Sequence, residues 1–329
     1  MYEQENTLDA LISYYILLCQ AEGKSAKTIR WYRQKLEFFA DFIKGRGYST
    51  RVERIETWHI REFIRWLESE VKVGENNPHR PTQDRLLSPY TVQGYVRTLR
   101  VFFNWAMQEG LIEENPMVRV RTPKAPKLAM PFFSEEEVQR LLKAAKGKGP
   151  VSQRNYAIIL MLLDTGIRVS ELTGLRMRDL YLAEGYFKVF GKGGKERIVP
   201  MGRTCRLALS RYVHKFRPRP ALASIDNVFL TRDGRPLRAD YVYKIVVNAC
   251  QRAGIEGKRR GPHTCRHTFA HQFLMNGGDL LTLQRILGHS SLEVVKLYVD
   301  LNTNDLLSQQ RKYSPIDTLQ GRRTENFTA

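Results

Sequence analysis

The sequence predicts a mainly α-helical protein with a small β-hairpin, divided into two domains. Three observations support this fold class. Apolar side chains recur at three- and four-residue steps through the first 110 residues, as they do on helices that bury one face. A basic, proline-rich stretch, residues 113–131, then interrupts this pattern. Further on, GYFKVFGKGGKERIVP (185–200) places apolar residues on both sides of a glycine turn, which is typical of a β-hairpin.

Four helices are expected before the proline-rich stretch. Their apolar spacing and end signals give the ranges 8–20, 25–44, 56–70 and 88–110. Ser25 and Ser88 are suited to cap the second and fourth helices, and Gly110 is suited to end the fourth. The polar segment 72–87, rich in Pro and Gly, predicts a loop. Four helices in about 100 residues form a small bundle.

The second domain is expected to combine helices with the hairpin. Ser134, followed by three acidic residues, marks a helix start. Helical patterns cover 134–146, 154–165, 204–217, 238–253, 264–276 and 280–287. We therefore predict a helical domain at 1–112, a linker at 113–131, a second domain at 132–300 and a C-terminal tail at 301–329. The basic linker either follows a phosphate backbone or is a solvated tether.

The positive charge indicates a polyanionic partner. The formal net charge is +19 and the pI is about 9.9. Residues 1–125 carry 19 Lys and Arg against 16 Asp and Glu, whereas residues 126–329 carry 34 against 18. Nucleic acid is the first candidate and an acidic membrane surface is the second. The alternative is a basic protein that is merely soluble, although the excess is larger than solubility requires.

The remaining bulk features favour a cytoplasmic protein, associated with the nucleoid if it is bacterial. No apolar run approaches the roughly 18 residues of a membrane span, so no membrane span is expected, and nucleic acid rather than a membrane is the expected partner. The N-terminus places acids before its apolar run and lacks the basic start of a signal peptide. Four scattered cysteines without a C-x-x-C pair indicate reduced thiols rather than disulfides or a zinc ribbon.

Several residues of the second half suit metal-free chemistry on a DNA phosphodiester. Such a reaction needs cations for the non-bridging oxygens, a nucleophile, and an acid for the leaving oxygen. The candidates, in chain order, are Arg168 beside a Thr-Gly break, Lys192 at the hairpin tip with Lys195 as its rival, His263 and Arg266 one helical turn apart, His289, and Tyr298. Taken alone, each has an ordinary interpretation as a surface or core residue.

The histidines at 263, 267 and 271 raise the alternative of a metal site, because residues four apart share one helix face. Zinc sites commonly include a carboxylate, but no Asp or Glu occurs between 257 and 278. Arg266 and the KRR run at 258–260 would also repel a cation. A metal site is therefore disfavoured, and His267 and His271, which have apolar neighbours in the chain, are interpreted as structural residues.

Four motifs occur in order along the chain: TGIRVSELTGL, GKGGKERIVP, HTCRHTFAHQF and LGHSSLEVVKLYV. This ordered set resembles the tyrosine recombinase (phage integrase) family and is most similar to its Xer-type and compact members. The resemblance spans nearly the whole chain. It implies an N-terminal four-helix core-binding domain with a SAM-like fold, followed by an α+β catalytic domain. It also implies site-specific recombination of double-stranded DNA.

The resemblance assigns roles to six residues. Tyr298 would attack the scissile phosphate and form a 3′-phosphotyrosyl link. Arg168 and Arg266 would bind the non-bridging oxygens, and His289 would donate a hydrogen bond to the phosphate. Lys192 would protonate the 5′-oxygen. His263 would assist proton transfer from the tyrosine, and neither ATP nor a cofactor would be needed.

The resemblance further implies that two domains clamp duplex DNA and that four protomers assemble on two sites. The tail could dock on a neighbouring protomer, with Leu301, Leu306 and Leu307 as apolar anchors. Two features depart from a compact member. The segment 72–87 looks longer than needed, and only about seven residues precede the first helix, so arm-site binding is not expected. The alternatives are a type IB topoisomerase and a catalytically silent DNA-binding or regulatory protein on the same fold.

Overall fold

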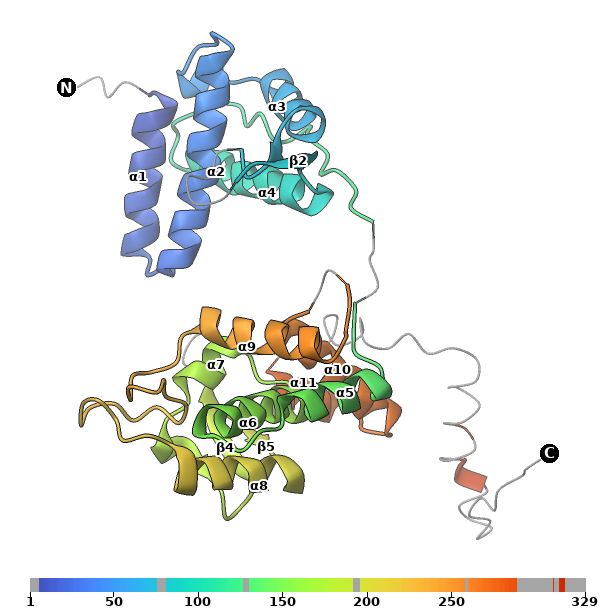
Figure 1. Cartoon of the computed structure of the whole chain (residues 1–329). Helices are drawn as coiled ribbons and strands as arrows, with labels where there is room; N and C mark the ends of the chain where they lie inside the picture. Colours follow the sequence, from blue (N-terminus) through green and yellow to red (C-terminus); the bar gives the residue numbers. More distant parts are fainter. Residues whose placement is uncertain are drawn as a thin grey trace. The chain divides into compact units, whose positions relative to one another are not determined.

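The chain divides into two compact units, Met1–Leu128 (unit 1) and Ala129–Ala329 (unit 2). The computed structural model describes residues 6–75, 81–126, 130–191, 196–257, 260–288, 310 and 314–316. Each unit has its own hydrophobic core and is described by itself (Figure 1). Among the described residues, no helix combines the length and the apolar character that crossing a bilayer would require.

Unit 1 is a helical bundle with a small hairpin. Its elements are α1 (Leu8–Ala21), α2 (Ala26–Gly45), the 3₁₀ turn η1 (Val52–Arg54), α3 (Thr57–Ser69), β1 (Lys72–Val73), β2 (Gln83–Leu86) and α4 (Pro89–Gln108). The predicted caps are confirmed, because the hydroxyls of Ser25 and Ser88 accept hydrogen bonds from the backbone N–H groups of Thr28 and Thr91. Gly110 follows α4 with a φ of 70°, as the predicted stop requires.

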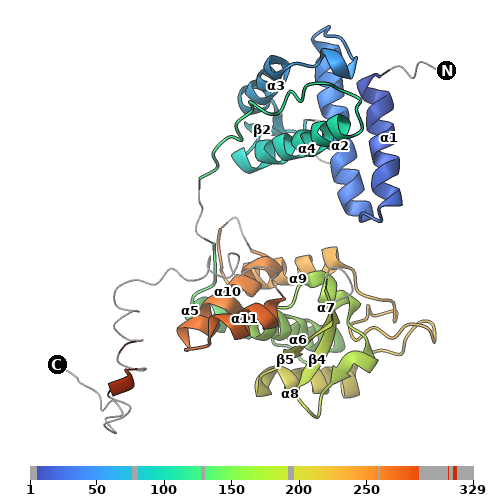
Figure 2. The ribbon, with the colours of Figure 1, turned by 180° about the vertical axis from the view of Figure 1, so that it is seen from behind.

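The core of unit 1 is rich in aromatic side chains. Helices α1 and α2 lie side by side, and α4 packs against both α2 and α3 (Figures 1 and 2). Phe39, Phe63, Phe102 and Phe103 are fully buried between them. The ring centroids of Phe39 and Phe63 are 5.0 Å apart in an edge-on arrangement, which is favourable for aromatic pairs.

The prediction of a loop over residues 72–87 is wrong at both ends. β1 and β2 pair in an antiparallel hairpin, with Lys72 opposite Leu86. Both strands are short and mostly exposed, and their sequences, KV and QDRL, show no apolar alternation. Backbone pairing and the ion pair between Lys72 Nζ and Asp84 Oδ1, at 2.7 Å, hold the hairpin together.

Residues 113–126 of the predicted linker lie along unit 1. Met117 and Val120 are buried in the core of this unit. The carbonyl of Val120 accepts a hydrogen bond from Arg100 Nη2 at 2.9 Å, and that of Pro123 accepts one from Gln93 Nε2 at 2.7 Å. Residues 113–126 are thus anchored by α4 without forming an element of their own.

Unit 2 combines helices with a three-stranded antiparallel sheet. Its elements are α5 (Glu135–Ala145), α6 (Pro150–Thr165), α7 (Val169–Gly174), η2 (Met177–Asp179), β3 (Leu180–Tyr181), β4 (Tyr186–Phe190), β5 (Glu196–Pro200), α8 (Arg203–Arg211), the π-helical turn η3 (Tyr212–Phe216), α9 (Ala239–Arg252), α10 (Pro262–Met275) and α11 (Leu280–Leu287). The predicted hairpin is confirmed, and β3 adds a third strand that the sequence analysis did not predict. The predicted helix start at 154 is too late, because Pro150 occupies the first turn of α6.

Helix α6 is the centre of unit 2. Helices α5, α8, α9 and α10 all pack against it (Figures 1 and 2). On the sheet, Phe187 and Val199 face each other and are buried, whereas Lys188 and Ile198 lie on the outer face. Helix α11 packs against both β5 and α10. The C-terminal ends of α6 and α11 and the beginnings of α7 and α10 are thereby fixed within one core.

Candidate functional site

The site is built around the C-terminal end of α6. Gly166 ends this helix with a φ of 60°, in the left-handed region that favours glycine. A Cβ at this position would lie 2.6 Å from Phe269 Cδ1 and 2.8 Å from Leu287 Cδ2, so a larger residue does not fit. The tight end of α6 thus brings α10 and α11 against the turn that leads to Arg168.

Arg266 joins the ends of α6 and α11. It lies on α10 and is only 4% exposed. Its Nη1 donates to the carbonyl of Gly166 at 2.6 Å, and its Nη2 donates to the carbonyl of Leu287 at 2.8 Å. Buried guanidinium groups require such acceptors, because desolvation would otherwise cost several kcal/mol. His263 lies one helical turn earlier and is exposed.

Arg168 also reaches this end of α11. It is the N-cap residue of α7, and Leu172 and Leu175 bury the base of this helix. Its Nη1 donates to Glu171 Oε1 at 2.9 Å, and its Nη2 donates to the carbonyl of Gly288 at 3.2 Å. The side chain is 35% exposed, so its guanidinium is held by protein groups and still borders solvent.

Glu171 and Arg197 complete the arrangement, and the sequence analysis identified neither. Arg197 on β5 donates to both carboxylate oxygens of Glu171, at 2.8 Å each, and its Nε donates to the carbonyl of Ile286 at 2.9 Å. Burial alone would raise the pKa of the Glu171 carboxyl, but hydrogen bonds from Arg197 and Arg168 outweigh burial and lower this pKa. The spacing of Glu171 three residues after Arg168 was a usable sequence signal, since such pairs meet on a helix.

Three arginines therefore bind three successive carbonyls at the end of α11. Arg197, Arg266 and Arg168 donate to the carbonyls of residues 286, 287 and 288, respectively. We call these three residues the arginine cluster. Cations are favourable at a helix C-terminus, where carbonyls lack partners within the helix. Because one carboxylate accompanies three guanidinium groups, the cluster keeps a net positive charge suited to a phosphate.

The structure describes three of the six sequence-predicted site residues. It brings Arg168 and Arg266 to adjacent carbonyls and places His263 on the helix that carries Arg266. Lys192, His289 and Tyr298 lie outside the described residues, as does Lys195. In the chain, Lys192 belongs to the connection between β4 and β5, and His289 directly follows Gly288.

The histidine stripe of α10 is divided between different surroundings. His263 is exposed, whereas the ring of His271 stacks on Phe132 with centroids 3.8 Å apart. In the part of the chain that the structure describes, no three His, Cys, Asp or Glu side chains come together as metal ligands.

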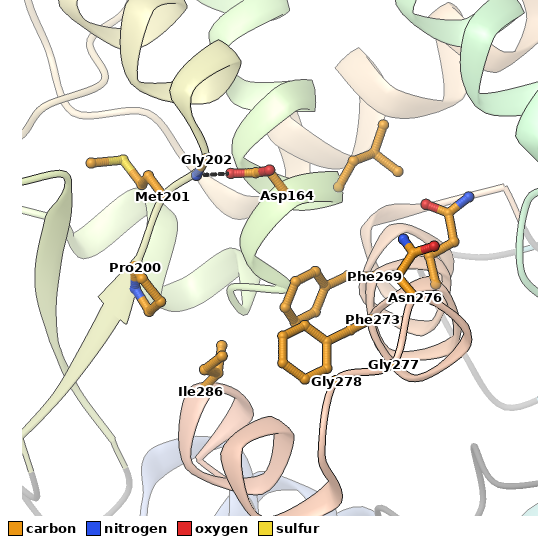
Figure 3. A pocket seen from close by; sticks show the side chains of 12 residues that line it. Asp164, Pro200, Met201, Gly202, Phe269, Phe273, Asn276, Gly277, Gly278 and Ile286 are labelled. Carbon is orange, nitrogen blue, oxygen red and sulfur yellow. Dashed lines mark hydrogen bonds between the residues drawn. The ribbon is translucent and has the colours of Figure 1, made fainter. Parts of the chain in front are cut away.

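A cavity of about 640 Å³ is lined in part by Ile286, whose carbonyl accepts a hydrogen bond from Arg197 (Figure 3). Phe269 and Phe273 of α10 form one wall, and Ile286 of α11 and the end of β5 contribute others. Asp164 lies at its edge and accepts a hydrogen bond from the backbone N–H of Gly202 at 2.7 Å. Burial raises the pKa of the Asp164 carboxyl, while this hydrogen bond and one with Cys205 oppose the increase. The cavity can accept apolar side chains.

Two family patterns match the chain. That of the phage integrase family matches residues 131–305, and that of the phage integrase SAM-like domain matches residues 10–122. The first match contains the whole arginine cluster, and the second contains nearly all of the unit 1 bundle.

Related proteins cover most of the chain. The tyrosine recombinase XerD of Listeria innocua is 31% identical over 310 residues, which are 93% of this chain and 99% of that protein. The tyrosine recombinase XerC of Thermodesulfovibrio yellowstonii is 34% identical over 299 residues, 90% of this chain and 92% of that protein. Among solved structures, the Tn1549 transposon integrase in complex with transposon right end DNA has a TM-score of 0.72 at 20% identity, with 92% of this chain and 98% of that chain covered. This structural similarity shows a shared fold.

Proposed function

The chain belongs to the phage integrase family and is a site-specific tyrosine recombinase, and we propose that it cuts and rejoins duplex DNA through a covalent bond between Tyr298 and a 3′-phosphate. The observation that carries this proposal is the convergence of Arg168 and Arg266 on adjacent carbonyls. These residues are separated by 98 positions, yet they reach residues 288 and 287 at one end of α11.

Preorganised arginines suit the chemistry at phosphorus. Charge accumulates on the non-bridging oxygens in the transition state, and a guanidinium that is already held by protein carbonyls needs little rearrangement to stabilise it. The planar fork of donors also matches the geometry of two phosphate oxygens. We assign these oxygens to Arg168 and Arg266, with a hydrogen bond from His289 to the same phosphate.

The proposed step balances without a metal ion or ATP. The phenol oxygen of Tyr298 attacks phosphorus, and the bond from phosphorus to the 5′-oxygen breaks. His263 assists removal of the phenol proton, and Lys192 gives a proton to the leaving 5′-oxygen. The phosphotyrosyl ester conserves the energy of the broken phosphodiester, so a 5′-hydroxyl from another strand can rejoin the DNA by the reverse step.

The partner in this proposal is double-stranded DNA bound by both units in the cytoplasm. The chain carries a formal net charge of +19, and most of the excess positive charge lies in residues 126–329. Cations that neutralise backbone phosphates release counterions, which drives binding and makes it sensitive to salt. The named relatives and the solved transposon integrase–DNA complex support this partner.

We further propose that four protomers assemble on two sites. The tail carries the apolar residues Leu301, Leu306 and Leu307, which suit the cavity of a neighbouring protomer lined by Phe269 and Phe273. Deletion of 303–329 and Phe273→Asp should both weaken assembly on paired sites in native gels. Leu207→Asp, on the exposed surface of α8, is the matched control. Unchanged assembly after the deletion would exclude this role of the tail.

The covalent step can be tested with candidate site DNA taken from the flanks of the coding sequence. The DNA carries a nick near the scissile phosphate, so that the cleaved fragment diffuses away and the adduct accumulates. The protein is incubated with it in EDTA and resolved on denaturing gels. We expect a protease-sensitive adduct that Tyr298→Phe abolishes. Tight binding without any adduct would favour a silent DNA-binding protein, and relaxation of plasmids without site preference would favour a topoisomerase.

A further inference from the structure

We infer that Arg197 is a positioning residue for recombination, which fixes both Arg168 and the end of α11. This inference rests on the proposed function, because Arg168 matters only if it binds the scissile phosphate. The side chain of Arg197 is only 13% exposed, and three of its hydrogen bonds are to protein groups. It is thus placed to act through its neighbours rather than on DNA.

The contact between Arg197 and Glu171 controls how the carboxylate faces Arg168. Two parallel N–H···O bonds of 2.8 Å hold the carboxylate plane, and Oε1 at the same time accepts from Arg168 Nη1 at 2.9 Å. Bidentate arginine–carboxylate pairs are geometrically specific. Without Arg197, the buried Glu171 would keep Arg168 as its charged partner and could draw the guanidinium away from the phosphate.

The second contact of Arg197 holds the end of α11. Its Nε donates to the carbonyl of Ile286, two residues before Gly288, whose carbonyl accepts from Arg168. Gly288 has a φ of 64°, and a Cβ there would lie 2.9 Å from both Cδ and Nε of Arg197. The glycine therefore allows the arginine to cross the helix end closely, immediately before His289 in the chain.

Arg197 also connects these contacts to the hairpin. It lies on β5 opposite Val189 of β4, and the connection between the two strands contains Lys192, five residues earlier in the chain. One side chain thus links the strand that follows Lys192 to the helix end that precedes His289 and to the carboxylate that holds Arg168. Arg197 is therefore placed to hold these three parts of the proposed site in position.

The test compares Arg197→Met, Arg197→Lys and Arg217→Met in the full-length chain. Arg217 is the matched control, because it also donates to carbonyls, those of Val228 and Asn227, but none of its donor contacts lies at the cluster. Single-turnover cleavage of the nicked DNA is measured at saturating protein, beside DNA affinity. We expect Arg197→Met to slow cleavage roughly tenfold or more while affinity changes less than about twofold. Lysine cannot make the bidentate contact, so Arg197→Lys should restore activity only in part.

The double variant with Arg168→Ala separates positioning from general damage. If Arg197 acts largely through Arg168, Arg197→Met should slow the Arg168→Ala protein by less than about threefold. A full, multiplicative loss in that background, or normal cleavage by Arg197→Met, would overturn the inference. An equal loss in Arg217→Met would also overturn the inference, because loss of any partly buried arginine would then have the same effect.

Hydrogen exchange supplies a measurement that does not depend on activity. The amide of Gly288 donates to the carbonyls of Gln284 and Arg285, and peptides covering 280–288 report on this turn. Exchange there should accelerate in Arg197→Met and not in Arg217→Met. Unchanged exchange in Arg197→Met would show that Arg197 does not hold the end of α11. A wild-type chain that forms no adduct would instead refute the proposed function, and with it the catalytic consequence of Arg197.

Discussion

Gly166→Ala should destabilise unit 2 by about 1–4 kcal/mol and impair cleavage by the folded protein. A left-handed conformation costs a residue with a Cβ about 1–2 kcal/mol. The new methyl group would lie 2.6 Å from Phe269 and 2.8 Å from Leu287, and overpacking of this kind costs about 1–3 kcal/mol. The smaller entropy of the unfolded alanine chain offsets about 0.4–1 kcal/mol of the sum.

The effect on cleavage follows from the carbonyl of Gly166. Relief of the clash moves this backbone, whose oxygen accepts from Arg266 at 2.6 Å. Arg266 would then lose one of the two backbone anchors that the structure describes, and cleavage should be slower even at temperatures well below the unfolding temperature. Denaturant unfolding gives the free energy, and the nicked DNA assay gives the rate.

Gly174→Ala is the matched control for this prediction. Gly174 ends α7, and a Cβ there meets nothing within 4 Å. Alanine should be neutral or stabilising by up to about 1 kcal/mol at this helical position. If Gly166→Ala were within about 0.5 kcal/mol of wild type and cleaved normally, the packing described at the end of α6 would be refuted.

Three further predictions concern charge. Burial lowers the pKa of Lys35 from 10.5 to about 8. The folded chain then binds fewer protons than the unfolded chain between about pH 8 and 10.5, so the stability of unit 1 should rise with pH in this window; denaturant unfolding should show a smaller rise in Lys35→Met. The pKa of Glu171 is lowered from 4.5, so its stabilising contribution should be present above pH 4.5 and lost as pH falls through the folded pKa. Unfolding free energies of wild type and Glu171→Gln should therefore converge on acidification, and a constant difference would contradict this. Finally, Arg168→Ala should slow cleavage about 100-fold or more. The slope of log binding affinity against log salt concentration should change by at most about 0.9, the value for one phosphate contact. Equal losses of binding and cleavage would argue against a role of Arg168 in the transition state.

Local signals allowed much of the helical fold to be predicted from the sequence. Ser25, Ser88 and Ser134 cap helices through bonds to residues three positions later, and such caps depend on only a few neighbouring residues. The strands β1 and β2 were missed because their stability comes from pairing across an exposed hairpin, which leaves no apolar alternation. The burial of Met117 and Val120 was not predicted, because isolated apolar residues between prolines show no periodic pattern.

The candidate site was predictable only in part, for a physical reason. Arg168, His263 and Arg266 were predicted as site residues from an ordered set of motifs, because the sequence does not show which residues lie close together in space. The contact between Glu171 and Arg197 joins a helix to a strand 26 positions away, and the carbonyls that the cluster binds belong to α11, some 90 positions further on. Backbone acceptors have no sequence signature, so the arrangement emerges only from the tertiary structure.

The most direct test of the proposed chemistry is to identify the residue that carries the DNA. The adduct formed in EDTA would be digested with nuclease and trypsin, and the modified peptide sequenced by mass spectrometry. The account predicts a nucleotide phosphate on the tryptic peptide 297–311, in which Tyr298 is the single tyrosine. A nucleotide on any other peptide, or an adduct that persists in Tyr298→Phe, would contradict it.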